Sequence, residues 1–298
     1  MSRTSSDLCV DVDLLPYRRV PAHKPEAAPL RPPAAMASGQ WTPLLAVAVL
    51  ALVVRLVYLW QVSQAPFFHL RLGDAEAYHD WALRIVGGNW RGDSVFYQAP
   101  LYPYFLAGVY ALFGAGAAMV RFIQAIIGSL SCVLLAAAGM ALFGTRGVVA
   151  GVLLAIYPAA IFLDGLFDKT TLVSFFTVTL LYLLAARHVR LREFFAGMVL
   201  GFLALTRENA LLLVLPVLLW FLIAERHSRP ALTAAAFLAG CALVLLPVGA
   251  RNYVVGGEFH LTTSQFGPNF YIGNHAGARG LYEPLVTGHG SVADERAD

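Results

Sequence analysis

Long apolar runs separated by short polar segments dominate the pattern of this chain. Clear examples are residues 44–62, 119–143 and 231–248. An α-helix needs about 20 apolar residues to cross a bilayer. The runs are continuous and do not alternate, so they favour membrane-spanning helices over the strands of a barrel. The pattern predicts an all-α polytopic membrane protein.

Four more spans follow from the same pattern. Residues 148–163 form one, which Pro158 is expected to kink, and residues 170–186 form another. The run 194–223 is too long for one helix and carries Arg207-Glu208 at its middle. A single helix would hold these charges near the bilayer centre at about 2.5–3.5 kcal/mol each. We therefore predict two short spans that reverse at Arg207-Glu208, which makes about seven spans in total.

The long loop 63–117, between the first two long runs, is predicted to carry two helices. Residues 74–86 have amphipathic spacing, which indicates a helix lying in the membrane interface. Asp74 stands in its first turn, where a carboxylate is favoured as a cap. Its apolar face holds Ala77, Tyr78, Trp81 and Ile85, and its polar face holds Glu76, Asp80 and Arg84.

The second helix of this loop, residues 101–113, has about 13 residues and is too short to span. We interpret it as re-entrant or interfacial. The positive-inside rule supports this independently, because counting it as a span would move the arginine-rich loops outside. With the N-terminus in the cytoplasm, the short inside loops hold Arg146, Arg187, Arg190, Arg192, Arg226 and Arg229.

Composition adds little beyond membrane character. The chain is 58% hydrophobic and 13% charged, and its net charge of +3 is too small to indicate nucleic-acid binding. Cys9, Cys132 and Cys241 lack metal-binding spacing and are expected to act as small apolar side chains. Residues 1–40 are predicted to be a disordered cytoplasmic tail, with Met36 as an alternative start. Residues 41–249 form the membrane core, and residues 250–298 form an extracytoplasmic segment.

The predicted topology collects the acidic residues with chemical potential on one side of the membrane. Asp74 and Glu76 come from the first loop, while Asp164 and Asp168 lie between two later spans. Carboxylates beside cations at a membrane boundary suit transfer from a lipid-linked phosphate donor. The carboxylate deprotonates an acceptor hydroxyl, and the cations stabilise the departing phosphate. The cations on this side are Arg121, Lys169, Arg207 and Arg251.

Each of these residues also has a plain structural interpretation. Asp74 can be a helix cap, Glu76 part of a solvated helix face, and Asp164 and Asp168 ordinary interface residues. Arg121 can anchor a helix end at the lipid headgroups. Arg55, inside the first span, is interpreted as snorkelling to the interface, with an inward contact to a ligand as the alternative.

The order of these segments resembles the GT-C superfamily of membrane glycosyltransferases. The resemblance runs from about residue 44 to residue 282. It is carried by an acid on a short helix after the first span, by LYPYFLAGVYALFG behind a proline, and by VRFIQAIIGSL. The bacterial branch related to protein O-mannosyltransferases and the lipid A aminoarabinose transferase is the most similar. Its members also have a seven-helix core with a long first outer loop.

The resemblance implies roles for individual residues. Asp74 stands where the family has its catalytic carboxylate, with Glu76, Asp164 and Asp168 as supporting acids. Glu76 is separated from Asp74 by Ala75, whereas protein O-mannosyltransferases carry adjacent acids. Gln98 replaces a basic residue or His that relatives often place before the proline. The donor phosphate is assigned to Arg121, Lys169 and Arg207, and the substrate loop to Tyr78, Gln98, Pro100 and Tyr102.

We therefore predict an inverting glycosyltransferase of the bacterial inner membrane with an extracytoplasmic active site. Its donor is a polyprenyl-phosphate sugar, and its acceptor is a hydroxyl on lipid, glycan or protein. No cofactor is assigned, and a divalent cation stays open. Relatives continue into further spans or a soluble domain, so a fragment of a longer protein is one interpretation of the chain. The alternatives are a lipid-linked-sugar flippase or transporter, although no internal repeat is seen, and a non-catalytic scaffold.

Overall fold

The computed structural model describes residues 41–224 and 229–279, and all regular structure within these ranges is helical. This confirms the predicted all-α membrane class. Three helical stretches are long and apolar enough to cross a membrane: Trp41–Val62, Ala117–Ala155 and Pro230–Gly256. The shorter apolar helices are Leu101–Phe113, Thr170–Ala185 and Glu208–Ile223. The total of seven spans is consistent with this arrangement and stays a prediction.

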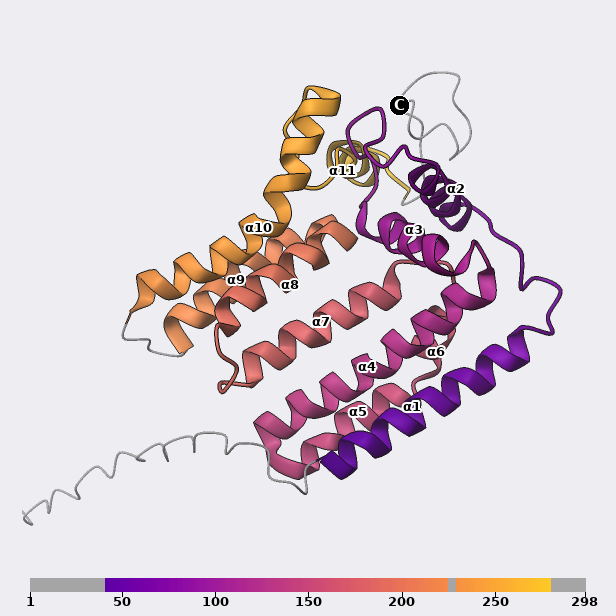
Figure 1. Ribbon diagram of the computed structural model, residues 1–298. Coiled ribbons are helices and arrows are strands. Elements are labelled where there is room, and N and C mark those ends of the chain that lie inside the picture. The colour runs from indigo at the N-terminus through magenta and orange to yellow at the C-terminus, as the bar shows by residue number, and fades with distance from the viewer. Residues whose placement is uncertain (1–40, 225–228, 280–298) are drawn as a thin grey trace, which may run out of the picture. The chain divides into compact units, whose positions relative to one another are not determined.

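The elements follow one another as successive passes and short end helices (Figure 1). In chain order they are α1 (Trp41–Val62), α2 (Asp74–Val86), α3 (Leu101–Phe113), α4 (Ala117–Phe143), η2 (Gly144–Gly147), α5 (Val148–Ala155), α6 (Pro158–Asp164), α7 (Thr170–Ala185), α8 (Arg192–Thr206), η3 (Glu208–Leu213), α9 (Val214–Leu219), η4 (Trp220–Ala224), α10 (Pro230–Gly256) and α11 (Phe266–Asn274).

Two breaks in the helices fall where the sequence predicts them. The run 148–163 divides into α5 and α6 just before Pro158, because proline lacks an N–H and clashes with a preceding turn. α8 ends at Thr206, and Arg207 is extended, with φ −151° and ψ 105°. The chain then turns into η3 at Glu208. The reversal therefore keeps both charged side chains out of a helix interior.

The last long helix is a correction to the predicted boundaries. α10 continues to Gly256, eight residues past the predicted end of the last span at Val248. The extracytoplasmic placement of residues 250–298 stays a prediction. Arg251 and Asn252 stay helical because their side chains bond to two neighbouring loops. Gly257 ends the helix at φ 77°, a left-handed conformation that glycine adopts readily. The predictions for residues 1–40, including Cys9 and Met36, lie outside the described residues.

The passes pack side by side through close backbone contacts. α8 lies against α10, and α7 lies between α4 and α8 (Figure 1). At the α8–α10 contact, a side chain on Gly197 would meet the Phe237 carbonyl, and one on Gly240 would meet the Phe194 carbonyl. Small residues at such points let helices approach closely in a membrane. The buried Cys132 and Cys241 fill positions in the same packing, as predicted.

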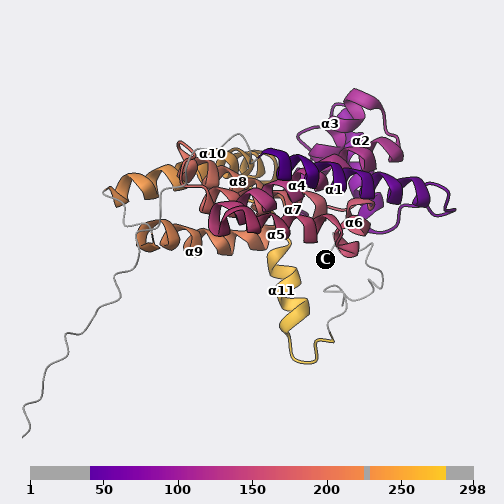
Figure 2. The ribbon, with the colours of Figure 1, turned by 90° about the horizontal axis from the view of Figure 1, so that it is seen from below.

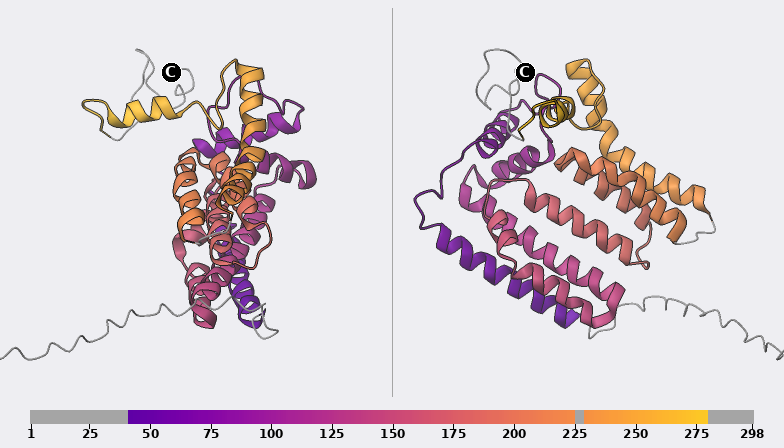
Figure 3. Two further views of the ribbon diagram at one scale, coloured as in Figure 1. Left: turned by 90° about the vertical axis from the view of Figure 1, so that its left-hand side faces the viewer. Right: turned by 180° about the vertical axis from the view of Figure 1, so that it is seen from behind.

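The two helices of the long loop pack against each other at one end of these passes. α2 and α3 match the predicted ranges residue for residue, and they contact one another. They form a core with the start of α4 and with Phe167. α11 stands apart from the other helices (Figures 2 and 3) and exposes Phe266, Phe270 and Tyr271.

An ion pair inside the bundle joins α1 to α6. Arg55 is only 2% exposed, and its Nε donates to Asp164 Oδ2 over 2.7 Å. Asp164 Oδ1 accepts a hydrogen bond from Thr171 Oγ1 on α7 at 2.8 Å. The interpretation of Arg55 as a snorkelling residue is wrong, because its charge is paired internally. Asp164 is likewise not an exposed interface residue.

Gly128 on α4 makes room for this pair. A Cβ at Gly128 would lie 2.1 Å from Asp164 Oδ2 and 2.7 Å from Arg55 Nε, whereas one at Gly108 on α3 meets nothing within 4 Å. We expect Gly128→Ala to lower the free energy of unfolding by about 2 kcal/mol or more, since it displaces a buried charged pair. Gly108→Ala should leave it unchanged or raise it slightly. Thermal unfolding in detergent compares the two variants, and equal stability would contradict this role of the pair.

Candidate active site

Asp74 is the first residue of α2, in the long loop between α1 and α4. Gly73 is the N-cap, and no side chain caps the helix. The Asp74 carboxylate is exposed and accepts a hydrogen bond from Gln98 Nε2 at Oδ1, over 3.1 Å. Asp74 therefore lies in the first turn, as predicted, but its carboxylate is engaged by the segment before α3. This contact fixes the Asp74 carboxylate while leaving the residue exposed.

The Tyr78 hydroxyl lies one turn further along α2, where several charged groups meet. Burial raises the pKa of Tyr78 well above its usual value, and the negative charges of Asp74, Asp168 and Glu208 raise it further. Arg207 opposes them. Tyr78 is fully buried, and its hydroxyl has no hydrogen-bond partner among the described residues. Carboxylates from α2, from the turn before α7 and from η3 thus all act electrostatically on one neutral phenol.

Asp168 is held by the start of α7. Its Oδ1 accepts hydrogen bonds from the backbone N–H of Thr170, at 2.7 Å, and from the Thr170 hydroxyl. An acid just before a helix satisfies free N–H groups and interacts favourably with the helix dipole. This local structural role fixes the side chain without removing its charge from the neighbourhood of Tyr78.

A buried amide ties this acidic region to the helices below. Gln124 Nε2 on α4 donates to the carbonyls of Asp164 and Leu166, at 2.8 and 2.6 Å. Its Oε1 accepts from the Tyr102 hydroxyl at 2.7 Å. Tyr102 in turn packs edge-on against Tyr78, with ring centroids 5.3 Å apart. The turn that leads to Asp168 is therefore fixed relative to α2 and α3.

Two guanidinium groups share one aromatic ring beside this turn. Arg121 lies over Phe68 at 4.1 Å and over Phe167 at 5.2 Å, and Arg71 lies over Phe167 at 5.6 Å. Arg121 Nε donates to the Gly165 carbonyl at 2.7 Å. Its Nη1 is shielded and has no partner in the described part of the chain. Two neighbouring cations with an unused N–H make a favourable environment for an anion.

The remaining predicted residues divide between surface and core. Glu76 is exposed on α2, and Pro100 is the buried N-cap of α3. Lys169 follows Asp168 and is partly exposed. Tyr102 is buried and donates a hydrogen bond to Gln124, so it helps to hold the turn that Gln124 binds. Asp164 belongs to the internal pair with Arg55.

Arg251 and Asn252, at the outer end of α10, connect two loops. Asn252 Oδ1 accepts from the Phe96 N–H at 3.2 Å, and its Nδ2 donates to the carbonyls of His260 and Thr262. Arg251 donates to the carbonyls of Arg91 and Ser94. Its guanidinium also lies 3.7 Å from the Phe96 ring centroid. The loop that ends at Gln98 is anchored to the last long helix in this way.

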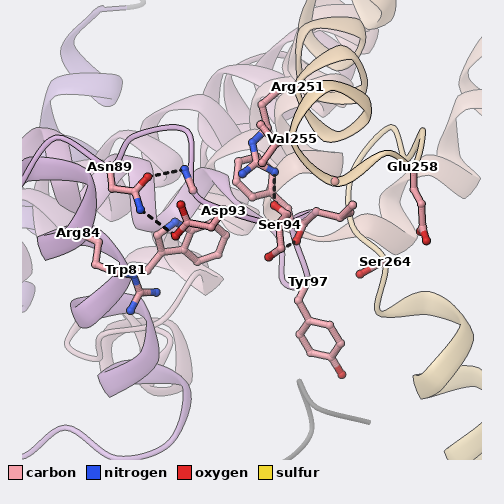
Figure 4. A pocket seen from close by; sticks show the side chains of 14 residues that line it. Trp81, Arg84, Asn89, Asp93, Ser94, Tyr97, Arg251, Val255, Glu258 and Ser264 are labelled. Carbon is pink, nitrogen blue, oxygen red and sulfur yellow. Dashed lines mark hydrogen bonds between the residues drawn. The ribbon is translucent and has the colours of Figure 1, made fainter.

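A polar pocket of about 820 Å³ is lined in part by this anchored loop. Its wall includes Trp81, Asp93, Arg251, Glu258 and Ser264. Figure 4 shows Arg251 bonded to the Ser94 carbonyl and Asn89 bonded to Asp93 at the rim. The Ser264 N–H donates to the Phe96 carbonyl at 3.0 Å, which joins the two loops. Gln98 directly follows Tyr97, and Gln265 directly follows Ser264; Tyr97 and Ser264 both line the pocket. The pocket therefore adjoins the acids Asp74, Asp168 and Glu208, which we call the acidic cluster.

The described residues contain no group of three or more His, Cys, Asp or Glu side chains arranged to hold a metal ion. The acids around Tyr78 are spread over three elements and are partly occupied by Gln98, Thr170 and other bonds.

Comparison with known proteins identifies the family. The model of the dolichyl-phosphate-mannose-protein mannosyltransferases matches residues 97–250, slightly more than half of the 298 residues. The chain belongs to this family. It is therefore a member of the GT-C superfamily and a membrane glycosyltransferase. No curated protein and no solved structure matches the chain significantly.

Residues at this site that sequence reasoning missed lie far apart in the chain. Glu208 was considered only as a charge in a reversal, and Arg71 and Gln265 received no role. The sequence could have indicated a role for Glu208, because an acid directly after a predicted helix break on the outer side can face the first loop. Arg71 precedes Asp74 by three residues, and nothing in the local pattern indicates that its charge approaches Arg121.

The anchor at Asn252 gives a test of how the loops are held. Asn252→Asp replaces the amide donor with a group that accepts only, so two hydrogen bonds to His260 and Thr262 are lost. At about 1 kcal/mol each, this should speed amide exchange around residues 91–98 and 258–264 about tenfold or more. Hydrogen exchange followed by mass spectrometry measures it. Val254→Ala, two residues away and exposed, is the control, and unchanged exchange in Asn252→Asp would refute the anchor.

Proposed function

We propose that the protein transfers a sugar from a polyprenyl-phosphate donor to a hydroxyl of an extracytoplasmic lipid, glycan or protein. The observation that carries the proposal is the exposed Asp74 carboxylate, which is held by Gln98 and which, together with Asp168 and Glu208, raises the pKa of the buried Tyr78. Family membership supplies the reaction class, glycosyl transfer. The arrangement supports a carboxylate acting at the membrane boundary on a lipid-borne substrate.

The transfer is a single displacement with Asp74 as general base. The Asp74 carboxylate removes the proton of the acceptor hydroxyl while the acceptor oxygen attacks the anomeric carbon. The bond between that carbon and the phosphate oxygen breaks, and polyprenyl phosphate leaves with the bonding electrons. The anomeric configuration inverts, and the proton passes from Asp74 to water. Gln98 orients the carboxylate through its 3.1 Å hydrogen bond.

The phosphate is assigned to the cations beside the acidic cluster. Arg121 offers an unused N–H and shares the Phe167 ring with Arg71. Charge on a departing phosphate is stabilised by such preorganised donors. Arg71 joins Arg121 in this assignment, and the predicted roles of Lys169 and Arg207 in binding the phosphate stay part of the proposal. The positive charge of Arg207 lowers the pKa of Tyr78, so Arg207 acts on the same part of the site as the acids.

The membrane placement follows from the charge pattern of the loops. With the N-terminus in the cytoplasm, the arginine-rich loops lie inside and the acidic cluster lies outside, as the positive-inside rule favours. A bacterial inner membrane with the active site facing out fits this orientation. A donor in the bilayer would reach the site laterally, between the helices and the interfacial α2.

Neutralising Asp74 is the first test. Asp74→Asn keeps the shape and the contact to Gln98 but removes the base, so transfer should fall by about 100-fold or more, within the typical range for general-base catalysis. Transfer is measured in membranes with a panel of radiolabelled polyprenyl-phosphate sugars. Asp80→Asn, on the exposed face of the same helix, should retain activity. Full activity of Asp74→Asn with normal membrane insertion would remove Asp74 from the mechanism.

Arg71 tests the phosphate assignment. Arg71→Gln removes a cation but preserves much of the side-chain volume, so the KM for the donor should rise by about tenfold, because a charge-assisted hydrogen bond is lost. Arg146→Gln, at the opposite end of α4, is the control for the loss of one positive charge. Initial rates against donor concentration give both constants. An unchanged donor KM in Arg71→Gln would disprove the assignment.

A further inference from the structure

Four shielded polar atoms around the acidic cluster have no hydrogen-bond partner among the described residues. They are the Tyr78 hydroxyl, Gln98 Oε1, Glu208 Oε2 and Gln265 Oε1. They come from α2, from the segment before α3, from η3 and from the segment before α11. Shielded polar atoms in proteins are nearly always paired with other protein groups or with ordered water, so these four atoms are free to accept hydrogen bonds from a ligand that displaces water.

The four atoms belong to one connected group. Gln98 bonds to Asp74, and Gln265 Nε2 donates to Glu208 Oε1 at 3.3 Å. The Ser264 N–H donates to the Phe96 carbonyl at 3.0 Å, which brings together the segments that carry Gln265 and Gln98. The charges of Asp74 and Glu208 both act on the Tyr78 hydroxyl, which is fully buried. The group therefore surrounds the carboxylate that the proposed mechanism uses as a base.

The orientation of the two glutamine amides is fixed by their partners. Each Nε2 faces a carboxylate oxygen, and an ionised carboxylate can only accept hydrogen bonds. Turning either amide would place two acceptors against each other. The unpaired atoms of Gln98 and Gln265 are therefore their amide oxygens. The unpaired atom of Glu208, Oε2, is also an oxygen that accepts hydrogen bonds.

The hydrogen-bonding capacity of these four atoms determines which ligand could bind them. Three of the four atoms only accept hydrogen bonds, while the Tyr78 hydroxyl both donates and accepts. A ligand that satisfies them must bring several hydroxyl hydrogens on neighbouring carbons. An ionised phosphate brings acceptors only, so it does not fit here and belongs with Arg71 and Arg121. A polyhydroxylated ring fits.

We propose that Gln98, Glu208 and Gln265 bind the hydroxyl groups of the transferred sugar, with Tyr78 completing the subsite. This assignment rests on the proposed function and adds the residues that recognise the sugar. The 3.3 Å hydrogen bond from Gln265 Nε2 to Glu208 Oε1 holds the two side chains together, while their other oxygens accept from the sugar hydroxyls. The sugar is then held between the base at Asp74 and the phosphate cations.

Binding to lipids with and without a sugar tests the subsite. The purified full-length protein in lipid nanodiscs is titrated with polyprenyl phosphate and with polyprenyl phosphates carrying mannose, glucose or 4-amino-4-deoxyarabinose. Glu208→Ala and Gln265→Ala should each weaken binding of the preferred sugar-bearing lipid about tenfold or more, because hydrogen bonds to the sugar are lost. Binding of the sugar-free lipid should stay the same, which also shows that the variants fold. Glu208→Gln, which keeps an acceptor oxygen, should lose less than Glu208→Ala.

Asn209→Ala is the matched control, because Asn209 follows Glu208 in η3 and is exposed. It should bind both lipids like the unmodified protein. If Glu208→Ala and Gln265→Ala bind the sugar-bearing lipid normally, or weaken both lipids equally, the subsite is overturned while the proposed function stands. If the unmodified protein prefers no sugar-bearing lipid and transfers none of the three sugars, the proposed function fails, and the subsite fails with it.

Discussion

A network of buried polar side chains inside the helical bundle determines where the chemistry can take place. Arg55 pairs with Asp164, and Gln124 holds the carbonyls of the turn that follows α6. Because α5 and α6 are short and separated by Pro158, apolar packing alone would leave this turn weakly located. Unpaired polar groups are costly in a low-dielectric interior, so these bonds hold the turn in one position. Asp168, at the end of the turn, is thereby directed toward α2.

A second polar anchor acts from the other side of the site. Asn252 and Arg251 bond mainly to backbone carbonyls and to the Phe96 N–H, so they hold the loop by its main chain. Gln98, two residues beyond Phe96, then reaches Asp74. The site is therefore built from loops whose backbones are fixed by buried side chains of long helices. Asp74, the proposed base, can stay exposed because these loops are held together by other residues. This separates the residues that provide stability from those that provide chemistry.

The sequence predicts the helices well because their signals are local. Apolar run length and amphipathic spacing give α2, α3 and α7 within one residue, and charge in the middle of a run gives the break at Arg207. The end of α10 was placed too early, because hydropathy falls at Arg251 while the helix continues. Its polar side chains are satisfied by loops about 10 and 160 residues away, and hydropathy carries no information about such partners.

The same limit applies to the site. Asp74 and Asp168 are recognisable from their positions at helix starts, and the charges of both raise the pKa of Tyr78. Asp164, the last residue of α6, was predicted on the same side of the membrane, yet it pairs with Arg55, 109 residues earlier. Whether an acid meets a cation inside the bundle depends on helix rotation and register, which one sequence does not specify. Glu208 and Gln265 contribute for the same reason, through a contact across 57 residues.

The most direct measurement is the side of the membrane on which the acidic segments lie. Single cysteines at Glu76 and Lys169, in a chain whose own three cysteines are replaced by serine or alanine, can be treated with a membrane-impermeant maleimide in sealed vesicles of known orientation. Convergence of Asp74 and Asp168 at one mouth predicts that both cysteines are labelled from the same side. Labelling of the two from opposite sides would contradict the account.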